Sequence, residues 1–217
     1  MSRSSLRPLR DGRLVTDRAF DEMYPKWART LSGTHFTPID VAVRAARWLT
    51  GEDGDIGDEP VVTDGGRPVR VLDVGAGVGK FCLVGALVTR GVFTGAELRP
   101  HLASIASEVA RRYGIKRCSF VAGDALALDW GAFDAFYLFN PFAELLPECP
   151  FIDNEIERTA EQYHRYVSAV EARLEDLPEG SRLVTYHGFG GRLPFGWTPV
   201  TSQRMHAGSL ALWRKSR

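Results

Sequence analysis

The chain has few cysteines, no excess of either charge and no long apolar run. Its 217 residues include three cysteines and no Cys-x-x-Cys pair, so neither a disulfide framework nor a cysteine-based zinc site is expected. Basic and acidic residues number 27 each, which disfavours a globally basic nucleic-acid binder but leaves local patches open. We also find neither a stretch of about 18 apolar residues nor the apolar core of a secretory signal. We therefore expect no membrane span and a cytoplasmic location.

The composition, 44% hydrophobic and 25% charged, is that of an ordinary globular protein with a substantial core. Residues 1–18 hold five arginines against two aspartates, a net charge of +3, and we expect a mobile arm, with contact to an anionic partner as the alternative. Residues 19–50 are expected to be helical, with Thr37 capping a helix that begins at Pro38. The glycine- and acid-rich residues 51–69 predict an exposed linker.

From residue 70 onward, buried-strand patterns alternate with helical ones. Strands are predicted at 69–74, 92–98, 118–124, 133–140 and 181–188, helices at 78–90, 100–113 and 154–175, and two closing strands within 197–215. This alternation predicts an α/β fold in which a doubly wound, mostly parallel seven-stranded sheet carries helices on both faces and ends in a C-terminal antiparallel hairpin. We expect this domain to span residues 70–217.

A glycine-rich turn follows the first predicted strand. It reads DVGAGVGK over residues 73–80, and Lys80 is expected to be a solvated helix residue. Glycines at such a strand end permit a tight turn and the close approach of a ligand. A triphosphate-binding loop needs a hydroxyl where Phe81 stands, so we exclude it. The dinucleotide fingerprint G-x-G-x-x-G has a different spacing, which leaves NAD as a lesser alternative.

The same turn resembles the first motif of the class I S-adenosylmethionine (SAM)-dependent methyltransferases, and the resemblance covers about residues 70–215. In that family an acid after the second strand chelates the ribose hydroxyls, and Glu97 stands there. An acid after the third strand receives the adenine amino group, and Asp124 stands there. The resemblance implies SAM as cofactor and no metal. The residues it assigns to the cofactor in this domain are Asp73, Gly75, Ala76, Gly77, Gly79, Glu97, Leu98, Gly123, Asp124, Ala125 and Asn140.

Two further resemblances concern the methyl acceptor. Asn140-Pro141-Phe142 resembles a shortened form of the Asn-Pro-Pro-aromatic motif of amino-methyltransferases, which implies that these three residues orient a target amine. Phe36 and Thr37 belong to a Phe-Thr-Pro segment similar to the one that opens the helix before the SAM domain in DNA adenine methyltransferases. That likeness implies contact with the methionine end of SAM and a lid formed by residues 1–50; a plain helix start is the alternative.

The whole set of motifs is also similar to the non-SET histone-lysine methyltransferases, whose matching loop is Asn-Asn-Phe, so Pro141 departs from it. The acceptor stays open between a protein lysine, a nucleic-acid base and a small-molecule amine. Tyr186, His187 and Gly188, at the end of the fifth strand, are further candidates to face it. A non-catalytic SAM-binding domain and an NAD-dependent oxidoreductase are the alternatives to a methyltransferase.

Overall fold

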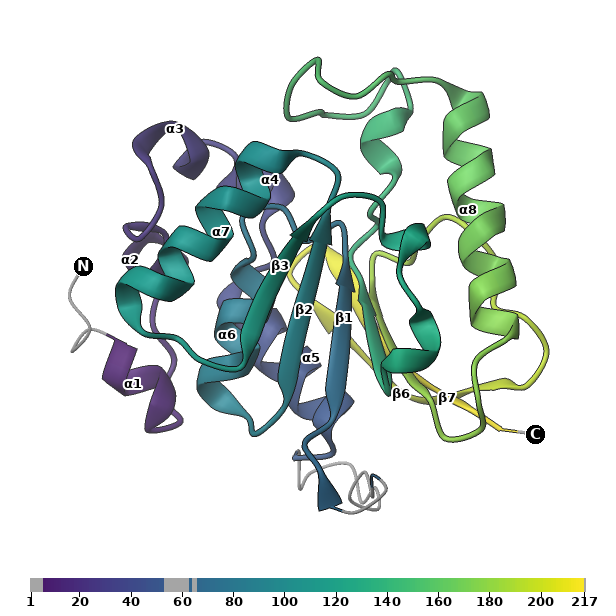
Figure 1. The fold of residues 1–217 in the computed structure, drawn as a ribbon, viewed down its shortest axis with the longest axis horizontal. Helices are drawn as coiled ribbons and strands as arrows, with labels where there is room; N and C mark the ends of the chain where they lie inside the picture. The colour runs from purple at the N-terminus through teal and green to yellow at the C-terminus, as the bar shows by residue number, and fades with distance from the viewer. Residues whose placement is uncertain (1–5, 53–62, 64–65, 217) are drawn as a thin grey trace.

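The computed structural model describes residues 6–52, 63 and 66–216, and a twisted sheet runs through its middle with helices on both sides (Figure 1). Most of the predicted linker lies outside these residues. The strands are β1 (Arg70–Val74), β2 (Val92–Glu97), β3 (Cys118–Ala122), β4 (Ala135–Leu138), β5 (Arg182–Tyr186), β6 (Trp197–Met205) and β7 (Gly208–Lys215). The α-helices are α1 (Arg7–Arg10), α2 (Asp17–Asp21), α3 (Lys26–Arg29), α4 (Ser32–His35), α5 (Ile39–Thr50), α6 (Lys80–Val88), α7 (Pro100–Tyr113) and α8 (Ala160–Glu175). Short 3₁₀ turns are η4 (Ala125–Ala127), η5 (Trp130–Ala132) and η6 (Ala143–Leu145).

The seven strands lie in the order β3-β2-β1-β4-β5-β7-β6. The first five are parallel, β7 runs antiparallel to β5, and β6 pairs antiparallel with β7. The predicted fold class is therefore confirmed. Because the chain moves outward from β1 through β2 to β3 and then returns to place β4 on the other side of β1, the order reverses between β1 and β4. Open α/β sheets bind ligands at the carboxyl ends of the strands at such a reversal.

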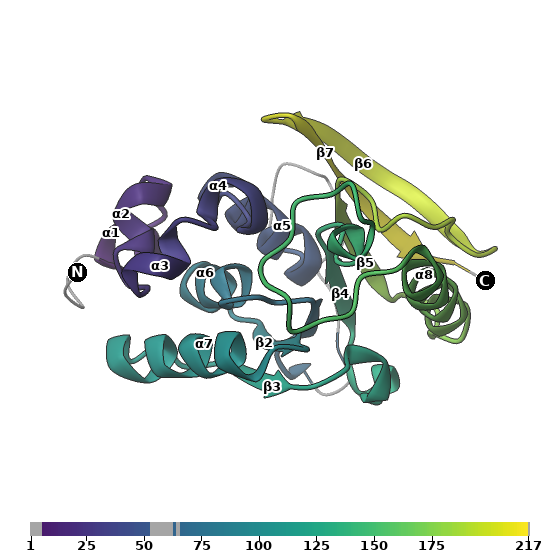
Figure 2. The ribbon, with the colours of Figure 1, turned by 90° about the horizontal axis from the view of Figure 1, so that it is seen from above.

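Each face of the sheet has its own apolar core. The side chains of Val71 and Phe93 belong to the core shared with α5, α6 and α7. Those of Leu72 and Phe136, on the opposite face, belong to the core shared with α8. Figure 2 looks down on the molecule and shows α5 to α7 on one side of the strands and α8 on the other. Within the described part of the chain, no helix combines the length and apolarity needed to cross a bilayer.

The basic N-terminal arm packs on the domain rather than extending from it, so the expected mobility is wrong for residues 6–18. Leu6 and Leu9 are fully buried, and α1 contacts α6. Two apolar side chains at a helical spacing bury enough surface to hold this short segment down. The arginines of α1 stay exposed at its outer side.

Lys80 is buried, contrary to the sequence-based expectation, because the N-terminal helices fold over it. Its side chain is 2% exposed, and Nζ lies 2.7 Å from a carboxylate oxygen of both Asp17 and Asp21. The same Asp17 oxygen accepts the Ile39 N–H at 3.0 Å and so serves the start of α5. Thr37 was expected to be the cap, but its hydroxyl lies 3.1 Å from the Tyr137 hydroxyl instead.

We predict that Lys80→Met lowers the free energy of unfolding by about 3–5 kcal/mol, because it leaves two acids without their buried counter-charge. Denaturant titration measures the change. Lys116→Met, at an exposed position, is the control and should stay within about 0.5 kcal/mol. Equal stability of the two variants would show that the ion pair does not hold the N-terminal helices.

Candidate functional site

A cavity of about 340 Å³ opens at the carboxyl ends of the parallel strands, at the reversal between β1 and β4. That volume suits one small organic ligand. Its walls come from the turns after the five parallel strands, together with α4 and the segment that follows η6. Among the predicted site residues, those lining it are Phe36, Gly75, Gly77, Glu97, Leu98, Gly123, Asp124, Ala125, Asn140, Pro141, Phe142 and His187; Tyr186 and Gly188 do not line it.

The glycine turn forms the floor of this cavity. Gly75, Gly77 and Gly79 all have positive φ values, of 76°, 55° and 77°, which side chains rarely tolerate. A Cβ on Gly77 would meet no atom within 4 Å, so the main chain is bare toward the cavity there. A Cβ on Gly75 would come within 3.1 Å of the Pro141 side chain. The turn is therefore packed directly against the loop after β4.

Glu97 ends β2 and is 5% exposed. Its Oε2 accepts the Gly77 N–H at 2.8 Å, and its Oε1 accepts the Arg99 N–H at 3.0 Å. Burial raises the pKa of Glu97, and the two N–H donors oppose that rise by favouring the carboxylate. Each oxygen keeps a further acceptor position for a ligand hydroxyl.

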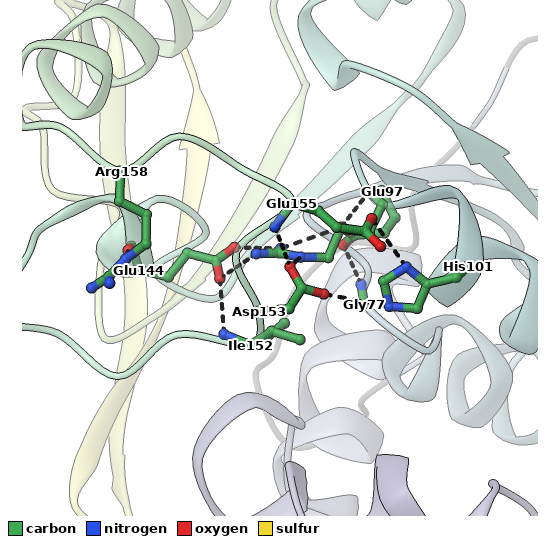
Figure 3. A network of polar contacts seen from close by, with 9 residues as sticks. Gly77, Glu97, His101, Glu144, Ile152, Asp153, Glu155 and Arg158 are labelled. Atoms are coloured by element: carbon green, nitrogen blue, oxygen red, sulfur yellow. Dashed lines mark hydrogen bonds and ion pairs between the residues drawn. The ribbon is translucent and has the colours of Figure 1, made fainter.

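Arg99 lies next to this carboxylate and is 1% exposed. Its guanidinium donates to both oxygens of Glu144, at 2.7 and 2.9 Å, and its Nε donates to Asp153 at 2.8 Å (Figure 3). These acids belong to the segment of residues 143–158, which we call the strap. Figure 2 shows the strap crossing the strand ends between α4 and α8. Arg99 thus fastens the strap to the end of β2.

Asp124 follows β3 and faces the other end of the cavity. Its Oδ1 accepts the Leu126 N–H at 2.9 Å, and its Oδ2 accepts the Tyr166 hydroxyl at 3.2 Å. The Tyr166 ring, from α8, stacks on Phe142 with centroids 5.1 Å apart. Tyr166 therefore connects the acid after β3 with the loop after β4.

The loop after β4 holds Asn140 in a left-handed conformation, with φ at 39°. Its N–H donates to the Gly188 carbonyl at 3.0 Å, and its own carbonyl accepts the Ala143 N–H at 3.2 Å. Asn140 lines the cavity, and its side-chain amide makes no hydrogen bond to any residue the structure describes. Asparagine tolerates this backbone conformation better than most residues, so the loop can present a free amide there.

Asp73 and Thr37 lie behind the glycine turn, beside a second, smaller cavity of about 40 Å³ that Ala76 also lines. Asp73 is 4% exposed, and Oδ2 accepts the Cys82 thiol at 3.5 Å. Burial raises the pKa of Asp73 to about 7, against the smaller opposing effect of that thiol. Gly79 lines neither cavity. A Cβ at this position would lie 2.3 Å from the Phe120 ring, so Gly79 allows the turn to pack against β3.

A family described as "Methyltransferase domain" matches residues 67–186, more than half of the chain. The chain belongs to this methyltransferase family. A search of curated proteins finds no match. An RNA methyltransferase from Salinibacter ruber, crystallised with S-adenosyl-L-homocysteine, superposes with a TM-score of 0.54 at 19% identity over 83% of this chain and 93% of its own. A putative methyltransferase, yhhF from Escherichia coli, superposes with a TM-score of 0.55 at 14% identity, over 82% of this chain and 87% of its own. A mutant of MtNAS in complex with S-adenosylmethionine superposes with a TM-score of 0.52 at 11% identity, over 99% of this chain and 71% of its own.

These solved structures share the fold of this SAM-dependent class I methyltransferase, and the residues around its cavity suit the cofactor. A carboxylate with free acceptor positions stands at the end of β2, a second carboxylate stands after β3, and bare main chain lies between them. Glu97 and Asp124 line the same cavity, as a shared nucleoside ligand requires. NAD and a triphosphate have no comparable support.

Several residues that shape the site were not identified from the sequence. Arg99, Glu144 and Asp153 carry no motif, and their association depends on the strap folding back over β2. Tyr166 lies 42 positions from its partner Asp124, within a helix that reads as an ordinary solvated one. His35 directly precedes the Phe-Thr-Pro segment and was assigned no role, yet it lines both cavities.

One group of potential metal ligands lies among the described residues: His101, Asp153 and Glu155, whose nearest ligand atoms fall within 4.8 Å of one another. The two ring nitrogens of His101 face different acids, at 3.5 Å from Asp153 and 3.3 Å from Glu155. A metal would draw both acids toward a single ring nitrogen. The His101 ring of α7 instead lies between two acids of the strap.

We predict that Glu97→Ala weakens SAM binding by about 1–3 kcal/mol, the range for losing hydrogen bonds to a charged group. Isothermal calorimetry measures it. Glu97→Gln should retain part of the affinity, because its amide oxygen still accepts one hydroxyl. Glu161→Ala, at an exposed position on α8, serves as the control. Unchanged affinity in Glu97→Ala would remove Glu97 from the cofactor site.

We predict that Asp73 makes the cofactor-free protein less stable as the pH rises from 4 to 7. Well below pH 3.8 the carboxyl is protonated in both the folded and unfolded states and has no effect on stability. Between its ordinary pKa of 3.8 and its raised value of about 7, only the unfolded state releases the proton, so stability falls, and above pH 7 the loss is complete.

Asp73→Asn removes this loss. Its free energy of unfolding relative to the native chain should rise by roughly 2–4 kcal/mol between pH 4 and pH 7.5, from a shift of about three pKa units. Urea titrations at the two pH values measure the difference. Asp176→Asn, on an exposed aspartate, controls for the loss of a surface charge. A pH-independent difference would mean that Asp73 ionises normally.

Proposed function

We propose that this methyltransferase transfers the methyl group of SAM to a nitrogen atom, and that Asn140, Pro141 and Phe142 orient the acceptor. The observation that carries the proposal is the free side-chain amide of Asn140. Asn140 lines the cavity, and its main chain is held on both sides by hydrogen bonds, to Gly188 and to Ala143. An amide oxygen fixed in this way can accept a hydrogen bond from an amine N–H.

The surroundings of Asn140 support the same reaction. Phe142 is held by stacking on Tyr166, and Pro141 is held against Gly75 of the glycine turn. A rigid wall of this kind aligns two reactants, and alignment is the main contribution a protein makes when the leaving group is already activated. When bound, SAM supplies a methyl group on a sulfonium centre.

We also propose roles for the cofactor residues, which their positions on the cavity support. Glu97 would bind the ribose hydroxyls and Asp124 the adenine amino group, with Leu98, Gly123 and Ala125 beside them. The bare main chain at Gly77 would admit the methionine part, and Phe36 would close over it from the N-terminal side. On this proposal residues 1–50 form the lid of the site. A cytoplasmic location stays a prediction.

We predict that Asn140→Ala lowers methyl transfer from radiolabelled SAM into a cell extract by about 100-fold, the usual loss for one fixed polar group at a reacting centre. The dissociation constant for S-adenosylhomocysteine should change less than about threefold, since the amide serves the acceptor. Asn140→Asp keeps the residue's tolerance of left-handed φ and separates the loss of the amide from a change of the loop. Asn154→Ala, on the exposed strap, is the control. Full transfer by Asn140→Ala would contradict the proposal.

A further inference from the structure

The charged side chains that line the larger cavity are acidic. Among the described residues that line it, the acids are Glu97, Asp124 and Glu144, and there is neither a lysine nor an arginine. A bound phosphate group needs a charge-assisted donor such as arginine or lysine to offset its desolvation. The cavity offers none, and its acids repel an anion.

Two buried cations, Arg99 and Lys80, lie beside the cavities, and each is paired with more than one carboxylate. Arg99 donates to Glu144 and Asp153 and also lies 3.8 Å from Glu97. Lys80, next to the smaller cavity, is paired with Asp17 and Asp21. Neither cation has charge left over for an anionic acceptor, so the potential in the cavity is negative.

The strap adds to this potential from above. Residues 143–158 contain five acids and one arginine, a net charge of −4. That arginine, Arg158, is committed to the strap itself, because its guanidinium donates to the carbonyls of Glu144, Leu146, Pro147 and Cys149 at 2.7 to 3.2 Å. Leu145, Cys149 and Ile152 from the underside of the strap line the cavity. A nucleic-acid backbone approaching this edge would meet an acidic roof.

The walls near Asn140 are aromatic. Phe36, Phe139 and Phe142 line the cavity, as does the Tyr166 ring. Aromatic faces attract a cation and offer nothing to an anion. The acidic and aromatic walls therefore both favour a cationic ligand.

His35 supplies the proton acceptor that a charged amine requires. It lies on α4 at the cavity wall. Burial lowers the pKa of His35, Glu144 opposes that change and Arg99 adds to it, and the net lowering favours the neutral imidazole. A neutral imidazole in reach of an ammonium group can take up the proton that must leave before nitrogen attacks carbon.

We propose that the methyl acceptor is a small amine with a net positive charge in solution and no phosphate, rather than a nucleic acid. This rests on the proposed function. The amine gives a proton to His35, and its freed lone pair forms the new C–N bond. The C–S bond breaks as its electron pair passes to sulfur, and His35 then releases the proton to water. The cavity is covered by α4 and by the strap, which the buried Arg99 fastens, and this cover favours a free small molecule over a macromolecule.

The test uses the full chain, radiolabelled SAM and fractionated cell extract. The probes are the protein fraction, deproteinised total RNA, and a low-molecular-weight fraction split by ion exchange into cationic, neutral and anionic pools. We expect label in the cationic pool. Label confined to RNA, to protein, or to the neutral or anionic pool overturns this inference and leaves methyl transfer intact. If SAM binds by calorimetry but no fraction is labelled, the proposed function fails and the inference fails with it.

A pair of variants tests the charge directly. Thr34 is exposed on α4 and lines the cavity. Thr34→Lys should lower labelling of the cationic pool at least about tenfold relative to Thr34→Gln, which has similar length and no charge. Because SAM is itself a cation, labelling is compared at SAM concentrations that saturate each variant, as measured by calorimetry. Equal labelling by the two variants would show that charge does not select the acceptor and would overturn the inference.

Discussion

The hydrogen bond from the Gly77 N–H to the Glu97 carboxylate is the interaction on which the site depends. It joins the turn after β1 to the end of β2 across the sheet, with one buried acid. The same carboxylate accepts the Arg99 N–H, and the Arg99 side chain reaches on to the strap. Floor, wall and roof of the cavity therefore meet at one residue.

The fold and the position of the cavity at the carboxyl ends of the strands were predictable because they depend on local sequence patterns. Strand and helix periodicity, and the left-handed glycines at 75 and 77, depend on neighbours in the sequence. Once parallel strands are inferred, their carboxyl ends must lie along one edge, so Glu97 and Asp124 had to approach each other. No long-range contact had to be guessed for these assignments.

The remainder depends on contacts between distant segments. Lys80 reads as a surface lysine, and only the fold of residues 6–36 over α6 buries it. The predicted helix at 154–175 begins at Ala160, where Thr159 accepts the Gln162 N–H, because Arg158 instead collects the carbonyls of the preceding strap. Such an arginine has no local signature. Sequence patterns describe elements well, but not the side chains that tie loops to them.

The contact between Gly75 and Pro141 has a consequence for how this enzyme can change. The glycine turn and the loop after β4 meet at a point where a Cβ on Gly75 would lie 3.1 Å from the Pro141 side chain. In-line displacement tolerates little error in the separation of the reacting atoms. On the proposed function, the spacing between donor and acceptor thus depends on the absence of a side chain at position 75, and a substitution there would alter it.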